Sequence, residues 1–153
     1  MARTHSPEFF EPSRDEAIAL LSRHRFGRLA YTFHDRVDIE PISYVYADGS
    51  VFGRTAEGTK LTTLRHHPWV AFEVDDVEGQ FDWHSVVVHG TLYFLDNEGD
   101  ERARAQYARA LELLRSVDPR VLTPSDVTPA RASIFRIYAD DITSRAAKTS
   151  RRT

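Results

Sequence analysis

Apolar and polar residues alternate along most of this chain with a period of two, which is the pattern of half-buried β-strands. The six segments that show this alternation or form short apolar runs are residues 25–33, 37–46, 51–54, 69–75, 81–95 and 132–138. Pro41 lies inside the second segment and has no N–H group to donate to a sheet. We therefore expect that strand to be interrupted, bulged or at a sheet edge near Pro41, with backbone groups open to a ligand.

Three other segments carry helical signals. Ser13 is followed three residues later by Glu16, which forms a capping box and predicts a helix running to about His24. A short helix is expected to start near Thr59, after a polar turn. A longer helix is expected over residues 98–116, where apolar residues recur at helical spacing and define one buried face.

Turn-forming residues separate the predicted strands. Asp48-Gly49 is a strong hairpin signal, so the strands on either side of it are expected to be antiparallel neighbours. Gly90 lies inside the longest predicted strand and indicates a bulge or sharp bend. Residues 77–80 are predicted to be a loop, and residues 118–129, which contain three prolines, are predicted to be an irregular connection.

Strands joined mostly by short turns, with two or three helices, predict a mainly β fold with flanking helices (α+β). The expected architecture is a six-stranded antiparallel sheet closed on itself as a small split barrel, with helices at its openings. A doubly wound parallel sheet fits worse, because strands and helices do not alternate. The predicted single domain spans residues 13–143, preceded by an irregular lead at 1–12 and followed by a basic, disordered tail at 144–153.

Composition narrows the class of protein. The chain has 153 residues, of which 41% are hydrophobic and 28% charged, as expected for one globular domain. Its net charge of −3 argues against a broad basic surface for nucleic acid or membranes. Cysteine is absent, which excludes disulfides, thiolate catalysis and cysteine-ligated metals. Since no signal peptide or membrane-spanning stretch is recognisable, we expect a cytoplasmic protein.

The segment from Arg54 to Lys60 has the chemistry of an anion site. Arg54 and Lys60 are cations, Thr55 and Thr59 carry hydroxyls, and the predicted helix start adds unpaired N–H groups and the positive end of a helix dipole. Together these groups suit a phosphate or carboxylate. The same residues also suit an ordinary capped surface helix, and both interpretations stay open at this level.

Other catalytic patterns are weaker. The adjacent His66 and His67 rarely converge on one ion and have no accompanying metal-binding pattern, so no metal site is predicted. No serine lies on a nucleophile elbow, and no hydrolase triad follows from spacing. The sequence identifies no catalytic acid or base.

Five segments occur in a familiar order. They are Gly-Arg-Leu-Ala-Tyr at 27–31, Pro-Ile-Ser-Tyr-Val-Tyr-Ala-Asp-Gly at 41–49, Val-Phe-Gly-Arg-Thr-Ala-Glu-Gly-Thr-Lys-Leu at 51–61, Pro-Trp-Val-Ala-Phe-Glu-Val-Asp at 68–75 and Trp-His-Ser-Val-Val-Val-His-Gly-Thr at 83–91. This ordered series, rather than any single motif, resembles the pyridoxamine 5′-phosphate oxidase-like flavoproteins. Within them the chain looks most like the branch of the nitroimidazole-resistance reductases. The resemblance covers about residues 13–138.

The resemblance implies a split β-barrel homodimer that binds FMN in two equivalent grooves at the subunit interface. It implies that Arg54, Thr55, Thr59 and Lys60 hold the FMN phosphate, and that Trp83 and Ser85 approach the flavin from their strand. The full set of implied cofactor-binding residues is Pro41, Ile42, Ser43, Arg54, Thr55, Thr59, Lys60, Leu61, Trp83 and Ser85. His84 is either a proton donor beside the flavin or a structural histidine.

The leading hypothesis is an FMN-dependent oxidoreductase, pyridoxamine 5′-phosphate oxidase-like or nitroreductase-like. Its flavin would take a hydride from reduced nicotinamide and pass electrons to a small molecule. One alternative is a flavin-binding sensor or carrier without turnover, and another is a barrel of this type that binds F420 or haem. A barrel that binds single-stranded nucleic acid is also conceivable, but the acidic pI counts against it.

Overall fold

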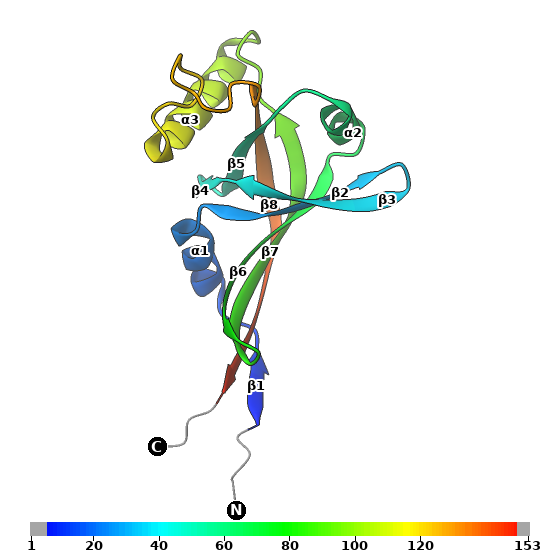
Figure 1. Ribbon diagram of the computed structural model, residues 1–153, viewed down its shortest axis with the longest axis vertical. Helices are drawn as coiled ribbons and strands as arrows, with labels where there is room; N and C mark the ends of the chain where they lie inside the picture. The colour runs from blue at the N-terminus through cyan, green and yellow to red at the C-terminus, as the bar shows by residue number, and fades with distance from the viewer. Residues whose placement is uncertain (1–5, 150–153) are drawn as a thin grey trace, which may run out of the picture.

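The computed structural model describes residues 6–149 of the chain, and in this range it contains one antiparallel eight-stranded sheet and three helices (Figure 1). The strands are β1 (Pro7–Phe10), β2 (Phe26–Phe33), β3 (Arg36–Ser43), β4 (Val45–Ala47), β5 (Ser50–Thr55), β6 (Trp69–Gly79), β7 (Asp82–Phe94) and β8 (Ser133–Thr149). The helices are α1 (Arg14–Arg23), α2 (Thr59–His66) and α3 (Glu101–Val117). None of these helices is long and apolar enough to cross a membrane.

The sheet closes into a barrel where β3 continues into β4. The strand order is β3-β2-β6-β7-β8-β5-β4, so β3 and β4 lie at opposite ends of the sheet although only Tyr44 separates them in the chain. The buried Tyr44 donates a hydrogen bond to the carbonyl of Leu21 in α1 (2.7 Å). Passing directly from one end of the sheet to the other closes it, as the sequence predicted.

The predicted behaviour of Pro41 is also confirmed. Pro41 lies in β3, whose only ladder partner among residues 6–149 is β2, and it faces Arg28 in the register of that pair. An edge strand is the position in a sheet that tolerates a residue without an N–H group. The single predicted strand 37–46 is divided into β3 and β4, and together with β1 this division accounts for the two strands beyond the predicted six.

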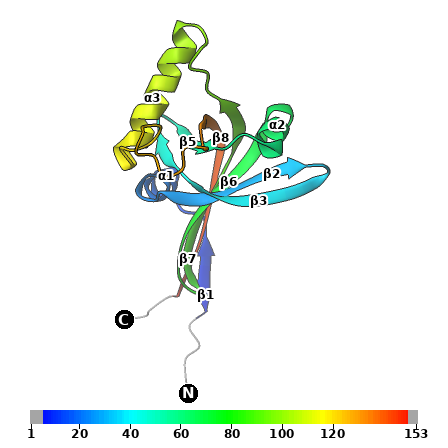
Figure 2. The same cartoon turned by 45° about the horizontal axis from the view of Figure 1, so that its top comes forward.

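Two hydrophobic clusters stabilise the fold. The first fills the barrel and includes Leu29, Phe72 and Ile137, each of which has an exposed fraction of 0%. The second lies between α3 and the outer face of β4, β5 and β8, and it includes Phe52 and Leu114. Figure 2 shows α3 standing beside the barrel, over these strands.

Beyond the barrel, β6, β7 and β8 continue as a narrow arm that also holds β1 (Figure 1). The predicted loop at 77–80 is wrong, since β6 continues to Gly79. The predicted lead and tail are wrong where the structure describes them, because Pro7–Phe10 and Ala146–Thr149 form a ladder. Ala147 faces Trp83 on one side and Phe9 on the other, so both edges of this part of β8 are paired. Residues 1–5 and 150–153 lie outside the described range.

The geometry predicted from local sequence signals is confirmed at three places. Ser13 and Glu16 form the predicted capping box at the start of α1, with Glu16 N donating to Ser13 Oγ (3.2 Å). Asp48 and Gly49 both have positive φ angles, 53° and 70°, in the β4–β5 hairpin. The register between β7 and β8 shifts at Gly90, where an added Cβ would lie 1.8 Å from the carbonyl oxygen of Tyr138.

The long helix begins later than predicted. Its N-cap is Asp100, whose side chain accepts a hydrogen bond from Ala103 N (2.8 Å), so the helix starts at Glu101 rather than at residue 98. The irregular connection predicted at 118–129 is confirmed.

Candidate functional site

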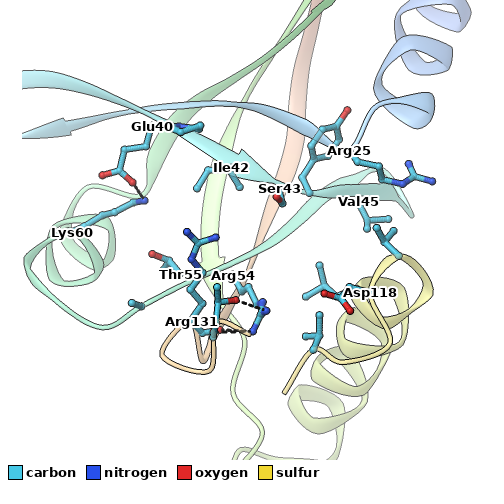
Figure 3. Close-up of a pocket in the computed structure, with 17 residues that line it drawn as sticks. Arg25, Glu40, Ile42, Ser43, Val45, Arg54, Thr55, Lys60, Asp118 and Arg131 are labelled. Carbon is cyan, nitrogen blue, oxygen red and sulfur yellow. Dashed lines mark hydrogen bonds and ion pairs between the residues drawn. The ribbon is translucent and has the colours of Figure 1, made fainter. Parts of the chain in front are cut away.

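A cleft of about 370 Å³ opens between β3, β5, the start of α2 and the end of α3 (Figure 3). Segments distant in sequence line it: the β3–β4 edge, β5, α2, α3 and the connection that precedes β8. Its lining residues are Arg25, Glu40, Pro41, Ile42, Ser43, Tyr44, Val45, Arg54, Thr55, Ala56, Lys60, Leu114, Val117, Asp118, Val121, Thr128 and Arg131. The volume and the mixture of apolar and charged side chains are those of a small-molecule site.

The structure brings most, but not all, of the predicted cofactor residues to this cleft. Those that line it are Pro41, Ile42, Ser43, Arg54, Thr55 and Lys60. Thr59 and Leu61 belong to the first turn of α2 but do not line the cleft. Trp83 and Ser85 lie on β7, which β2 and β6 separate from β3 in the sheet. Within one chain these two residues are therefore away from the cleft.

Hydrogen-bond donors gather where β5 leads into α2. Thr55 is 8% exposed, and its hydroxyl has no hydrogen-bond partner within residues 6–149. Gly58 caps α2 without a side-chain hydrogen bond, so the amides of the first turn, next to Lys60, have no side-chain cap. An accessible hydroxyl on a largely buried threonine, a lysine and the start of a helix together suit an anion.

Lys60 of α2 forms an ion pair with Glu40 of β3, at one end of the cleft (Figure 3). Tyr31 donates its hydroxyl hydrogen to the other carboxylate oxygen of Glu40 (2.9 Å). Partial burial by itself would raise the pKa of Glu40, but the hydrogen bonds from Lys60 and Tyr31 outweigh it and hold that pKa below its usual value. Burial and the contact with Glu40 raise the pKa of Tyr31, so Tyr31 stays a neutral donor.

Arg54 of β5 is held by the connection between α3 and β8. Its two terminal nitrogens donate to the two carboxylate oxygens of Asp126 (2.6 and 3.0 Å), and one also donates to Thr128 Oγ1 (2.9 Å). Asp126 accepts further hydrogen bonds from the backbone amides of Leu122 and Thr128, both 2.9 Å. The contacts with Arg54 and these amides hold the pKa of Asp126 well below its usual range.

The Arg54 contacts define what this arginine does in the cleft. The side chains of Arg54 and Asp126 are 12% and 1% exposed, so the pair is shielded from water. Because both terminal nitrogens of Arg54 are already bonded to the connection, Arg54 fixes the wall of the cleft that carries Thr128 and Arg131. Its predicted contact with a phosphate stays a prediction.

Sequence reasoning missed several parts of the cleft. The sequence patterns assign no role to Glu40, Asp118 and Arg131, which line the cleft, or to Asp126, which holds Arg54. One local signal for Asp126 exists: an aspartate two residues before Thr128, in a proline-rich connection, is typical of a side chain that accepts its neighbour's N–H. No local signal connects Asp126 to Arg54.

Within its own chain His84 has the contacts of a structural histidine, and a role beside the flavin stays a prediction. It does not line the cleft, and its Nε2 lies 2.7 Å from the hydroxyl of the buried Ser144. Burial and the nearby charge of Arg23 lower the pKa of His84, which favours a neutral ring at physiological pH. The hydroxyl of Ser85 donates to Glu73 (3.0 Å).

Comparison with known proteins places the chain in a family. The profile of the pyridoxamine 5′-phosphate oxidase family matches residues 13–146. An FAD-binding protein from Mesorhizobium loti is 25% identical, with a TM-score of 0.72 over 92% of this chain and 99% of that one. An FAD-binding protein from Mycobacterium smegmatis is 30% identical, with a TM-score of 0.63 over 89% of this chain and 98% of that one.

The predicted closeness to the nitroimidazole-resistance reductases is corrected by a further comparison. A candidate 5-nitroimidazole antibiotic resistance protein from Bacteroides thetaiotaomicron has a TM-score of 0.70 but is only 12% identical, over 93% of this chain and 89% of that one. A likeness at this identity shows a shared fold alone, and both FAD-binding proteins are more similar in sequence. The chain belongs to the pyridoxamine 5′-phosphate oxidase family and has its antiparallel split-barrel fold.

Proposed function

We propose that this protein binds a flavin in the cleft beside α2 and uses it as the redox cofactor of a small-molecule oxidoreductase. The observation that carries the proposal is the arrangement of two kinds of group across one cleft. Thr55, Lys60 and the start of α2 lie on one side and suit a flavin phosphate. The edge of β3 from Pro41 to Ser43 lies on the other and offers backbone groups to the flavin ring.

The proposed flavin is FMN, and FAD is the second candidate. The names of the Mesorhizobium loti and Mycobacterium smegmatis proteins support a flavin and favour FAD for those relatives. FMN and FAD share the ring system and the first phosphate, so either would place that phosphate near Lys60.

The proposed assembly is a homodimer in which the second copy completes the cofactor site. The predicted residues Trp83 and Ser85 do not line the cleft of their own chain, so a contact with the flavin requires them to come from a partner. Apolar side chains next to the cleft are uncovered: Val37 and Ile39, on the same strand as Pro41, are 77% and 62% exposed. Exposed apolar groups near a site support a covering partner.

The chain's own residues bind, orient and shield the cofactor in this proposal. Lys60 and Thr55 anchor the phosphate, and the β3 edge orients the ring. Ile42 and Val121, both less than 10% exposed, supply apolar walls that exclude water. When bound, the flavin supplies hydride and electron transfer, with reduced nicotinamide as the proposed donor.

An absorption spectrum of the purified protein tests the proposal first, followed by release of the bound molecule by heat and determination of its mass. We expect a flavin spectrum and the mass of FMN, whereas the mass of FAD would select the second candidate. A colourless protein that takes up neither FMN nor FAD would contradict the proposal. Uptake of F420 or haem by that colourless protein would favour the other cofactors of this fold.

Turnover is tested separately from binding. The flavin-loaded protein is mixed with reduced nicotinamide and a small acceptor, and oxidation of the nicotinamide is followed over many turnovers. Steady oxidation supports the oxidoreductase. A bound flavin that no reduced nicotinamide reduces would support the sensor or carrier alternative instead.

A further inference from the structure

A second cleft, also of about 370 Å³, lies on the outer face of the sheet between α3 and the strands β5 and β8. It shares no lining residue with the cleft beside α2. On α3, Arg102, Gln106 and Arg109 are spaced so that they share one helix face. Across the sheet, Phe52 and Arg136 are paired in the β5–β8 register, so they point to the same side. The helix face and the sheet face meet at this cleft.

The cleft carries two arginines without an acidic partner. Arg109 is neutralised, because its Nε lies 3.0 Å from Asp48 and another of its nitrogens lies 3.4 Å from Glu112. Arg102 and Arg136, in contrast, form no ion pair with any residue in the range 6–149. Asp48, which also feels the charge of Arg136, is the single acid in the lining, so the three arginines and Asp48 leave the cleft with a net charge of +2.

A hydrogen bond to a buried serine fixes the orientation of the Arg136 side chain. Its Nε donates to Ser50 Oγ (2.8 Å), and Ser50 is completely buried. The two terminal nitrogens of Arg136 have no acceptor in the part of the chain that the structure describes. The guanidinium also lies 5.7 Å from the ring centroid of Tyr138, which adds a cation–π contact. A fixed guanidinium with free terminal N–H groups is ready to bind an anion in a defined orientation.

The floor of the same cleft is apolar. Phe52 is 4% exposed and belongs to the hydrophobic cluster under α3, and Leu95 packs against that cluster. Ala105, a small residue on α3, also lines the cleft and leaves space above the floor. A ligand that fits this arrangement has an anionic group and an apolar body.

We propose that this second cleft binds a small organic anion. Arg102 and Arg136 hold its carboxylate or phosphate group, and Phe52 and Leu95 contact its apolar or aromatic body. Two guanidinium groups form parallel N–H to oxygen hydrogen bonds with either kind of anion. The site is separate from the proposed flavin cleft, so this proposal does not depend on the flavin.

Nuclear magnetic resonance of the ¹⁵N-labelled full chain tests the proposal at the residues concerned. The probes are phenyl phosphate and benzoate, with benzyl alcohol as the uncharged comparison. We expect saturable shifts of the Arg136 Nε–Hε signal and of the Gln106 side-chain amide with one or both anions, and none with benzyl alcohol. Comparison of the two anions identifies which charged group the site prefers.

Two matched substitutions on α3 sharpen the test. Arg102→Gln removes one of the two proposed anion contacts and should weaken phenyl phosphate or benzoate binding about tenfold. Arg104→Gln removes the same charge from an exposed position of the same helix that does not line the cleft, so its binding should match the wild type.

Three results would overturn the proposal. These are the absence of saturable shifts at Arg136, equal shifts with benzyl alcohol, and equal effects of the Arg102 and Arg104 substitutions. Because the measured signals belong to residues of this cleft, a failure of flavin binding would not be mistaken for a failure here.

Discussion

Two pairs of cation and carboxylate border the cleft beside α2, and they differ in burial and in hydrogen bonding. Arg54 and Asp126 are 12% and 1% exposed, and Asp126 also accepts hydrogen bonds from two backbone amides. Lys60 and Glu40 are 17% and 39% exposed, and the additional donor to Glu40 is one tyrosine hydroxyl. The first pair links β5 to the irregular segment that precedes β8, and the second pair links α2 to β3.

This difference separates a structural cation from an available one. Breaking a buried, fully hydrogen-bonded pair leaves a charge without compensation and is strongly destabilising. Breaking a partly exposed pair costs much less, because water replaces part of the lost contact. Arg54 therefore shapes the cleft, while the function we propose has Lys60 exchange Glu40 for the flavin phosphate. The sequence pattern treated the two cations as equivalent.

The largest expected effect is that of Arg54→Ala on stability. Removing the guanidinium leaves Asp126 buried without its partner, and we expect Tm to fall by about 10 °C. Thermal unfolding followed by circular dichroism measures this change. Arg131→Ala is the matched control, because Arg131 lines the same cleft but its side chain has no hydrogen bond or ion pair within residues 6–149. If both variants keep the Tm of the wild type, Arg54 is not the structural cation.

Lys60→Ala should weaken flavin binding strongly and change stability little. We expect its Tm to stay within about 2 °C of the wild type, because the pair with Glu40 is partly exposed. The dissociation constant of the flavin should rise roughly 30-fold, since a charge-assisted hydrogen bond to the phosphate is lost. Flavin titration followed by fluorescence measures this constant.

Arg65→Ala is the control for Lys60. Arg65 is an exposed cation in the last turn of the same helix, away from the cleft, so its removal should leave flavin affinity unchanged. Unchanged affinity in Lys60→Ala would remove Lys60 from the proposed phosphate site.

Glu40→Gln should strengthen flavin binding modestly. The substitution frees Lys60 from its carboxylate partner, and we expect the dissociation constant to fall roughly threefold. The same titration measures it. Asp38→Asn is the control for charge alone, because Asp38 is an exposed acid on the same strand that forms no ion pair with Lys60. A weaker affinity in Glu40→Gln, or an equal gain in both variants, would contradict competition between Glu40 and the ligand for Lys60.

The smallest expected effect is on the pH dependence of stability. Since the folded state lowers the pKa of Glu40, its contribution is present above the pKa of an unfolded glutamate, about 4.3, and is lost as the pH falls through the lower folded value. Between about pH 5 and pH 3 the wild type should lose roughly 1–2 °C more in Tm than Glu40→Gln. Thermal unfolding at a series of pH values measures the difference, and parallel profiles would show that Glu40 contributes nothing.

Elements with short-range hydrogen bonds could be predicted closely from the sequence. The capping box of Ser13 and Glu16 and the hairpin turn at Asp48-Gly49 join residues within a few positions of each other. These signals survive because neighbouring atoms supply most of the energy.

Elements that depend on distant partners were predicted less well. The segment Ser144–Thr149 reads as a polar tail, yet it forms the end of β8 because β7 pairs with one edge and β1 with the other. β1 was missed for the same reason. The backbone N–H and C=O groups of a strand form hydrogen bonds with other strands. The residues of the strand itself do not indicate which strands these are.

The candidate site, like the fold, combines features that the sequence predicts with features that depend on long-range contacts. The residue types between Arg54 and Lys60 predicted either an anion site or an ordinary capped surface helix, and Pro41 predicted an open backbone beside it. Folding decided which acid each cation meets: Asp126 lies 72 positions from Arg54, and Glu40 lies 20 positions from Lys60. Burial follows from those long-range contacts, and the burial of the carboxylate partner, 1% exposed for Asp126 and 39% for Glu40, is what distinguishes the two cations.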